Sequence, residues 1–200
     1  SGVAQNPIKD WEAYKEELLE RMGSEDKITR LLINRAKQNP KRIVYAEADH
    51  LDVLKAAQQV YDEKIAIPIL LGRRDVILEL MTEIEFEGED IIIIDPKSDE
   101  EEKKRNEYAE ALWKKRSRKG VTLYDAKKIL RERNYFAAMM VEKGDADAML
   151  SGYSRAYPSV LKPILELIGK ENGVTNVAAT NLMNSKRGPI FISDTSININ

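Results

Sequence analysis

Short apolar runs alternate with amphipathic helical segments along the middle of this 200-residue chain. Strands are predicted for residues 42–47 (RIVYAE), 65–72 (IAIPILLG), 90–95 (DIIIID) and 147–152 (DAMLSG). The run 65–72 is almost continuously apolar, as is typical of a strand covered on both faces. Since helical segments separate these strands, the sequence predicts an α/β fold: a three-layer domain with helices on both faces of a parallel sheet.

The two ends of the chain carry different patterns. Residues 1–23 predict a linker helix that docks on a neighbouring domain, with Trp11 and Tyr14 at helical spacing. Residues 24–171 predict the α/β domain, and residues 172–200 contain two further strands that would open an incomplete second domain. Because no methionine begins the chain and no helix follows its last strand, we expect it to be truncated, part of a longer protein.

Composition argues against several function classes. The 32 basic and 34 acidic residues nearly cancel, so no general attraction to nucleic acid or to an anionic membrane is expected. The absence of cysteine excludes disulfides and thiolate nucleophiles, and it fits a reducing, cytoplasmic location. No apolar run is long enough to span a membrane, and the first residues lack the pattern of a secretory signal.

The familiar catalytic and nucleotide-binding motifs do not occur. There is no GxGxxG after a strand and no GxxxxGK[ST], and GYSRA lacks the second glycine of a nucleophile elbow. The only histidine, His50, lies at the first turn of a helix, where a capping or surface role outweighs catalysis. Asp145 and Asp147 lie at a helix-to-strand turn, where backbone hydrogen bonding explains them better than a metal does. We therefore predict neither a catalytic residue nor a metal ligand.

The segment SGYSRAYP, residues 151–158, follows the last strand of the predicted parallel sheet and leads into a helix. Ligands of open parallel sheets bind beyond the carboxyl ends of the strands, where helix N-termini favour anions. Ser151, Gly152 and Ser154 lie at this place, and Arg155 offers a forked contact to phosphate or carboxylate. The alternative is a capped turn whose arginine is solvated. From these residues alone, the two interpretations are equally good.

Three segments taken together resemble the phosphate acetyltransferase/butyryltransferase family: NPKRIVYAEADHLDVLKAAQQVYDEKIAIPILLGRR, NYFAAMMVEKGDADAMLSG and PIFISDTSININ. With IKDWEAYKEELLERMG and SGYSRAYPSVLKPILELIG, the chain looks like the C-terminal phosphotransacetylase-like region of bacterial NADP-dependent malic enzymes. The resemblance implies the two-domain architecture of isocitrate and isopropylmalate dehydrogenases, with coenzyme A in the cleft between domains. It also implies an acetyl-CoA-sensing regulatory module that forms a homo-oligomer. NADP and a divalent metal would belong to a preceding malic enzyme catalytic domain, outside this chain.

The chain departs from the family's transferases at the turn. Those enzymes place His-Thr-Thr after the Ser-Gly pair, then a further Thr and an Arg before the helix proline. Here the residues are Arg155, Ala156 and Tyr157, then Val160 and Lys162. Three hydroxyls are replaced while positive charge is kept, so we expect binding of acetyl-CoA or a related acyl-CoA without acyl transfer. An active phosphate acetyltransferase and a pure assembly module remain the alternatives. The implied acetyl-CoA contacts are Ser151, Gly152, Ser154, Arg155, Tyr157 and Lys162.

Overall fold

The computed structural model describes residues 10–12, 14–15, 23–88, 90–185 and 188–193. Most of the linker helix expected over residues 1–23 lies outside these residues. The chain divides into two compact units, of which the larger comprises residues 36–173. The smaller comprises residues 1–35 and 174–200.

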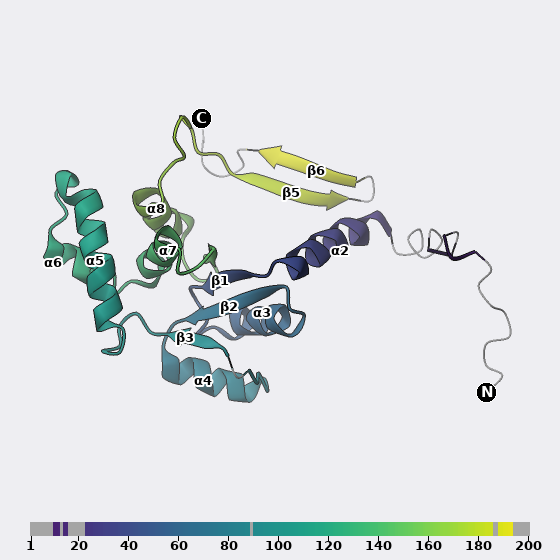
Figure 1. The fold of residues 1–200 in the computed structure, drawn as a ribbon, viewed down its shortest axis with the longest axis horizontal. Coiled ribbons are helices and arrows are strands. Elements are labelled where there is room, and N and C mark those ends of the chain that lie inside the picture. Colours follow the sequence, from purple (N-terminus) through teal and green to yellow (C-terminus); the bar gives the residue numbers. More distant parts are fainter. Residues whose placement is uncertain (1–9, 13, 16–22, 89, 186–187, 194–200) are drawn as a thin grey trace. The chain divides into compact units, whose positions relative to one another are not determined.

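A four-stranded sheet forms the centre of the larger unit (Figure 1). Its strands are β1 (Lys41–Tyr45), β2 (Ala66–Leu71), β3 (Ile92–Ile94) and β4 (Ala148–Leu150). They lie in the order β3-β2-β1-β4, and every neighbouring pair is parallel. Each strand overlaps one of the predicted strand segments, with β1 beginning one residue earlier, so the predicted parallel sheet is confirmed.

The strands of the larger unit are joined by helices. These are α3 (Leu51–Asp62), α4 (Arg74–Glu83), α5 (Glu102–Arg116), α6 (Leu123–Ile129), α7 (Arg133–Lys143) and α8 (Tyr157–Leu167), with a short 3-10 turn η1 (Ser117–Lys119) after α5. The helical segment over residues 122–144 consists of two helices, α6 and α7. The break comes where Glu132 leaves the helical conformation and caps α7, its carboxylate accepting from the N–H groups of Asn134 and Tyr135.

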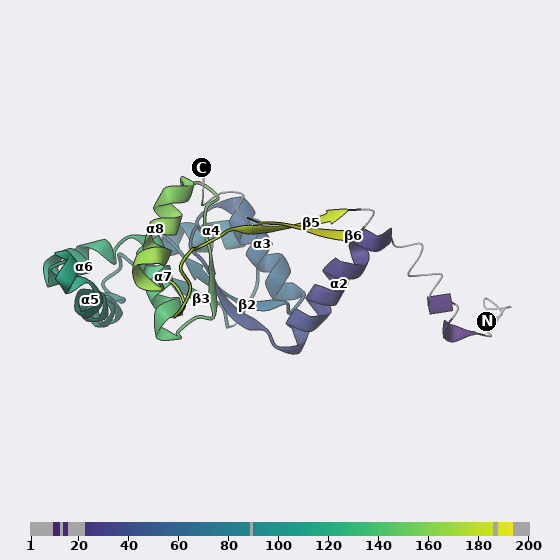
Figure 2. The ribbon, with the colours of Figure 1, turned by 90° about the horizontal axis from the view of Figure 1, so that it is seen from above.

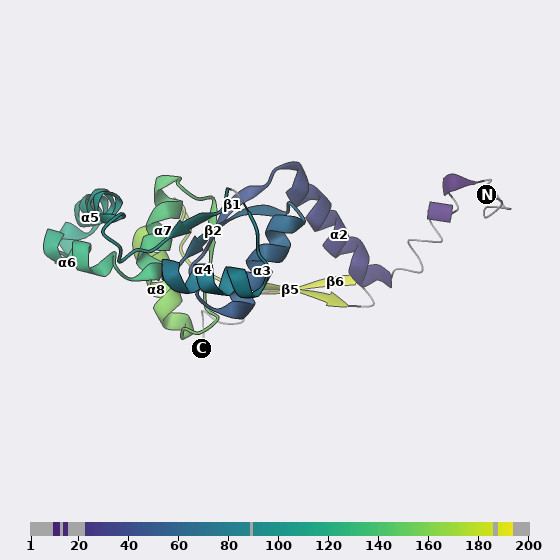
Figure 3. The same cartoon turned by 90° about the horizontal axis from the view of Figure 1, so that it is seen from below.

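Helices cover both faces of the sheet. On one face, β1 and β2 pack against α5 to α8, where the buried rings of Tyr108 and Phe136 meet edge to face. On the other face, Leu70 of β2 packs with Leu54 of α3 and Ile77 of α4. Figures 2 and 3 show the same layers from two opposite directions, with α5 beside α6 and α7 beside α8. The predicted three-layer α/β domain is therefore observed.

The connections of the sheet reverse direction at β1. The chain passes from β1 to β2 and β3 through α3 and α4 on one face, and from β3 to β4 through α5, α6 and α7 on the other. Because β4 pairs with β1, the reversal lies between these two strands. Open α/β sheets bind ligands beyond the carboxyl ends of their strands at such a switch point.

The smaller unit contains an antiparallel hairpin of β5 (Thr180–Ser185) and β6 (Gly188–Ser193). These strands are the two that the sequence predicts after residue 171. The helix α2 (Gly23–Gln38) begins in the smaller unit, and its last residues belong to the larger one. Across the described residues, no helix combines the length and the apolar character needed to cross a membrane.

Candidate functional site

A buried carboxylate lies at the switch point of the sheet. Glu47, two residues after β1, is 1% exposed. Its carboxylate accepts hydrogen bonds from the backbone N–H groups of Gly152 (2.7 Å), Tyr153 (2.8 Å) and Ser154 (3.0 Å), and from the Ser154 hydroxyl. The turn between β4 and α8 thus folds around an anion, as its glycine and its N–H groups suggest, but that anion is a side chain of the protein itself.

Glu47 remains ionised in this environment. Burial by itself would raise its pKa, because the charged form loses hydration. The hydrogen bonds from the Ser154 hydroxyl and from the three N–H groups outweigh burial and lower the pKa from 4.5 to about 2. The carboxylate is therefore a fixed negative charge that holds the β4–α8 turn against β1 at neutral pH.

Of the other residues predicted to contact the ligand, some are hydrogen-bonded within the fold and some are exposed on the surface. The Ser151 hydroxyl donates to Oδ1 of Asn134, which is buried at the start of α7 (2.7 Å). Tyr157 is the first residue of α8 and is exposed, and Lys162 is exposed on the same helix. Of the six predicted residues, only Arg155 lines the cavity that opens beside the turn.

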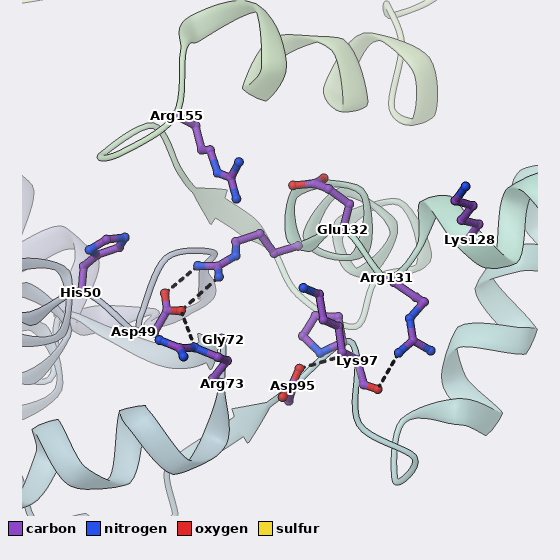
Figure 4. Close-up of a pocket in the computed structure, with 12 residues that line it drawn as sticks. Asp49, His50, Gly72, Arg73, Asp95, Lys97, Lys128, Arg131, Glu132 and Arg155 are labelled. Atoms are coloured by element: carbon purple, nitrogen blue, oxygen red, sulfur yellow. Dashed lines mark hydrogen bonds and ion pairs between the residues drawn. The ribbon is translucent and has the colours of Figure 1, made fainter.

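This cavity has a volume of about 600 Å³ and lies beyond the carboxyl ends of β1, β2, β3 and β4 (Figure 4). Each strand is followed by residues that line it, and the loop between α6 and α7 closes its remaining side. The lining residues are Asp49, His50, Gly72, Arg73, Asp95, Pro96, Lys97, Lys128, Arg131, Glu132, Arg133 and Arg155.

An ion pair forms the inner wall of the cavity. The guanidinium of Arg133 donates to both oxygens of Asp49, at 2.6 and 3.0 Å, and Nε of Arg73 lies 3.7 Å from the same carboxylate. The Asp49 side chain is only 7% exposed. Burial would raise the pKa of Asp49, but the hydrogen bonds and the positive charge of Arg133 lower it. Asp49 is thus ionised and neutralised within the wall.

Cationic side chains outnumber carboxylates in the lining of the cavity. Among the lining residues, Arg73, Lys97, Lys128, Arg131, Arg133 and Arg155 are cationic, against the carboxylates of Asp49, Asp95 and Glu132. All three carboxylates are engaged: Asp49 by Arg133, Glu132 as the cap of α7, and Asp95 by the N–H of Lys97 (2.9 Å). Within the described part of the chain, no carboxylate lies within ion-pair distance of Lys97, Arg131 or Arg155.

Gly72, directly after β2, makes room for the ion pair. A Cβ atom at this position would lie 3.3 Å from Cβ and Cγ of Asp49 and 3.2 Å from Cδ1 of Ile77. Such contacts are closer than ordinary van der Waals packing, so a larger residue would press on both Asp49 and Ile77. Glycine here serves close packing of the wall.

Of the six cationic side chains that line the cavity, sequence analysis identified only Arg155 as a candidate ligand contact. Arg73 and Lys97 follow β2 and β3 directly, so the rule that singled out Arg155 after β4 applies to them as well. Lys128, Arg131 and Arg133 carried no comparable signal. They reach the cavity because α6 and the start of α7 fold back to the edge of the sheet, a tertiary arrangement that local pattern does not encode.

The two weaker candidates of the sequence have structural partners. His50 occupies the N-cap position of α3 without a side-chain cap bond, and its ring packs 5.4 Å from that of Tyr153. Asp147 accepts hydrogen bonds from the backbone and side chain of Arg42, and Asp145 pairs with Lys104 at 2.8 Å. No group of three or more metal-binding side chains occurs among the residues described.

Comparisons with known proteins place this architecture. The model of the phosphate acetyl/butaryl transferase family matches residues 27–200. An NADP-dependent malic enzyme from Haemophilus influenzae is 33% identical over 100% of this chain and 27% of its own length, and one from Escherichia coli is 31% identical over 99% and 26%. This chain thus spans about a quarter of the length of these relatives.

Phosphate acetyltransferases also match. That of Acetivibrio thermocellus is 33% identical over 74% of this chain and 43% of its own length. The crystal structure of a phosphotransacetylase from Streptococcus pyogenes superimposes with a TM-score of 0.75 at 30% identity, covering 85% of this chain and 52% of that one. The resemblance inferred from the sequence is therefore confirmed.

Proposed function

Because the chain belongs to the phosphate acetyl/butaryl transferase family, we propose that it is an acetyl-CoA-sensing regulatory module of an NADP-dependent malic enzyme and not itself a transferase. In this proposal a preceding domain binds NADP and a divalent metal and decarboxylates malate to pyruvate. The present chain binds acetyl-CoA and assembles the protein into a homo-oligomer. Matches to malic enzymes over essentially the whole of this chain support the assignment.

The observation that carries the proposal is the position of Arg155. Its guanidinium extends from the β4–α8 turn toward a cavity in which cations outnumber carboxylates (Figure 4). An arginine that has no carboxylate partner among the described residues, at the carboxyl edge of a parallel sheet, is suited to an anionic ligand, and acetyl-CoA carries phosphate groups. Tyr157 and Lys162, exposed on α8, would contact parts of the same ligand outside the cavity.

The hydrogen-bond donors of the turn support the absence of catalysis. Acyl transfer requires donors directed at the oxygen that gains negative charge. The N–H groups of Gly152 and Ser154 and the Ser154 hydroxyl all donate to Glu47, and the Ser151 hydroxyl donates to Asn134. Ala156 and Val160 add no donor in their side chains. The serine hydroxyls of the turn are thus committed to the fold, while Arg155 contributes positive charge for binding. Ser151, Gly152 and Ser154 would contact the ligand by van der Waals packing, because their donors are engaged within the fold.

The architecture in this proposal is that of the isocitrate and isopropylmalate dehydrogenases, with the ligand in a cleft completed by a second domain. The parallel sheet and its likeness to a phosphotransacetylase support it. The finer assignment remains a prediction, as do the boundaries of the domains.

Calorimetric titration with acetyl-CoA, combined with an assay for acetyl phosphate in the same mixture, tests the function. Saturable binding without acetyl phosphate formation is the expected result. Formation of acetyl phosphate from acetyl-CoA and phosphate would establish the transferase instead. Oligomers without any binding of a CoA ester would leave an assembly module.

A further inference from the structure

The geometry points to a diphosphate-binding site in the cavity beyond β1, β2 and β3, with Lys97, Lys128, Arg131 and Arg155 as its cationic ligands. The diphosphate would belong either to an acyl-CoA or to a free nucleotide or pyrophosphate. The first source rests on the proposed function, whereas the second does not. The site is distinct from the Ser151–Ser154 turn, whose donors already hold Glu47.

The cations converge on one space from separate elements. Figure 4 shows Arg155 extending from the β4–α8 turn and Lys97 from the loop after β3 into the same cavity, with Arg131 beside Lys97. Like charges held together in a concave surface repel one another unless an anion lies between them. Since six cationic side chains line the cavity against three carboxylates, a bound anion would balance the excess positive charge.

The cationic residues are held in place by the fold. Arg105, buried at 7% exposure, donates to the carbonyls of Pro96 and Ser98 and so secures the loop that carries Lys97. Arg131 donates to the carbonyl of Lys97 (3.3 Å), which joins this loop to the end of α6. Such a preorganised loop is expected of a binding site more than of a solvated surface.

The first turn of α6, the helix that carries Lys128, is closed by a cap. Thr122 and Asp125 form a reciprocal capping box at the start of this helix: the Thr122 hydroxyl accepts from the Asp125 N–H (3.1 Å), and the Asp125 carboxylate accepts from the Thr122 N–H (3.2 Å). Lys128 lies in the last turn of this helix and lines the cavity from a different element than Arg155 does (Figure 4).

A diphosphate fits this distribution better than a single phosphate does. The cations lie on both sides of a cavity of about 600 Å³, so two linked anionic groups engage more of them than one. Arginine and lysine are common ligands of phosphate oxygens, and arginine adds two parallel hydrogen bonds. Asp49 and Arg133 neutralise each other, which leaves the excess positive charge to the other cations of the lining.

The test uses inorganic pyrophosphate as the probe, titrated calorimetrically into the 200-residue chain. The variant Lys97→Ala/Lys128→Ala removes two ligands without touching Arg155 or the Glu47 turn. The variant Lys55→Ala/Lys103→Ala removes the same charge from exposed positions that do not line the cavity. We expect saturable binding that weakens about tenfold or more in the cavity variant and little in the control, given the usual strength of charged hydrogen bonds. Succinate, with two carboxylates, should bind more weakly than pyrophosphate.

Competition with acetyl-CoA identifies the source of the diphosphate. If acetyl-CoA displaces pyrophosphate and also loses affinity in the cavity variant, the diphosphate is that of the acyl-CoA. If pyrophosphate binding depends on Lys97 and Lys128 while acetyl-CoA does not compete, the site takes a free diphosphate and acetyl-CoA sensing fails in this cavity. If pyrophosphate does not bind, or if both double variants lose affinity equally, the inference is overturned. If the cavity variant then binds acetyl-CoA with unchanged affinity, the proposed function still holds.

Discussion

Glu47 accepts hydrogen bonds from both the backbone N–H and the hydroxyl of Ser154, which lies 107 residues further along the chain. This contact joins the end of β1 to the β4–α8 turn across the switch point of the sheet. Arg155, the next residue, is thereby placed at the cavity. A buried carboxylate of the fold thus determines where a cation of the candidate site lies.

Replacing this carboxylate should destabilise the domain. Glu47→Gln removes the charge and turns an amide NH₂ toward N–H donors, so we expect a loss of about 2 kcal/mol in the free energy of unfolding. Urea unfolding followed by circular dichroism measures it. Glu83→Gln, at the exposed end of α4, is the control and should change stability by less than about 0.5 kcal/mol. Equal stability of the two variants would contradict this role of Glu47.

The same carboxylate predicts a dependence of stability on pH. The pKa of Glu47 is lowered from 4.5 to about 2 in the folded state, so the folded state binds its proton less readily than the unfolded state. Its contribution is therefore complete above pH 4.5 and is lost as the pH falls toward 2, by roughly 1.4 kcal/mol for each unit of the pKa difference. Unfolding free energies of the wild type and Glu47→Gln should converge on acidification. A gap that stays constant from pH 6 to pH 3 would contradict the assignment.

The ion pair between Asp49 and Arg133 should be strongly coupled. A double-mutant cycle with Asp49→Asn and Arg133→Gln should give an interaction energy of about 1–3 kcal/mol, since both side chains are largely shielded from water. The exposed pair Lys37–Glu63, with 3.9 Å between its charged atoms, provides the comparison and should give less than about 1 kcal/mol. Coupling energies of the same size for both pairs would show that Asp49 and Arg133 do not act as a unit.

Gly72→Ala tests the packing behind this pair. The added methyl group would meet Asp49 at 3.3 Å, so we expect destabilisation by about 1–2 kcal/mol. In an Asp49→Ala background the contact with Cγ is removed while the contact with Cβ remains, so the cost of Gly72→Ala should shrink in part. Thermal unfolding of the four proteins in this cycle measures the effect. An unchanged cost in that background would place the strain at Ile77 or at Cβ of residue 49, and not at the carboxylate.

The parallel sheet and its helices follow from local pattern, whereas most of the site does not. A nearly continuous apolar run such as 65–72 predicts a strand, because a strand buried on both faces requires apolar residues along its length. Arg155 was identified because it lies in the turn after a strand, and the same reasoning reaches Arg73. Glu47 and Arg133 act through partners 84 or more residues away in sequence, so only the folded chain reveals what they contact.

The acetyl-CoA affinity of Arg155→Ala, measured by calorimetry beside the wild type and Lys103→Ala, tests the central claim most directly. If the turn presents this arginine to the ligand, removing it should weaken binding by about 1–3 kcal/mol, roughly tenfold to a hundredfold, while Lys103→Ala binds as the wild type does. An affinity unchanged by Arg155→Ala would contradict the account, and the turn would then be a packed corner of the fold.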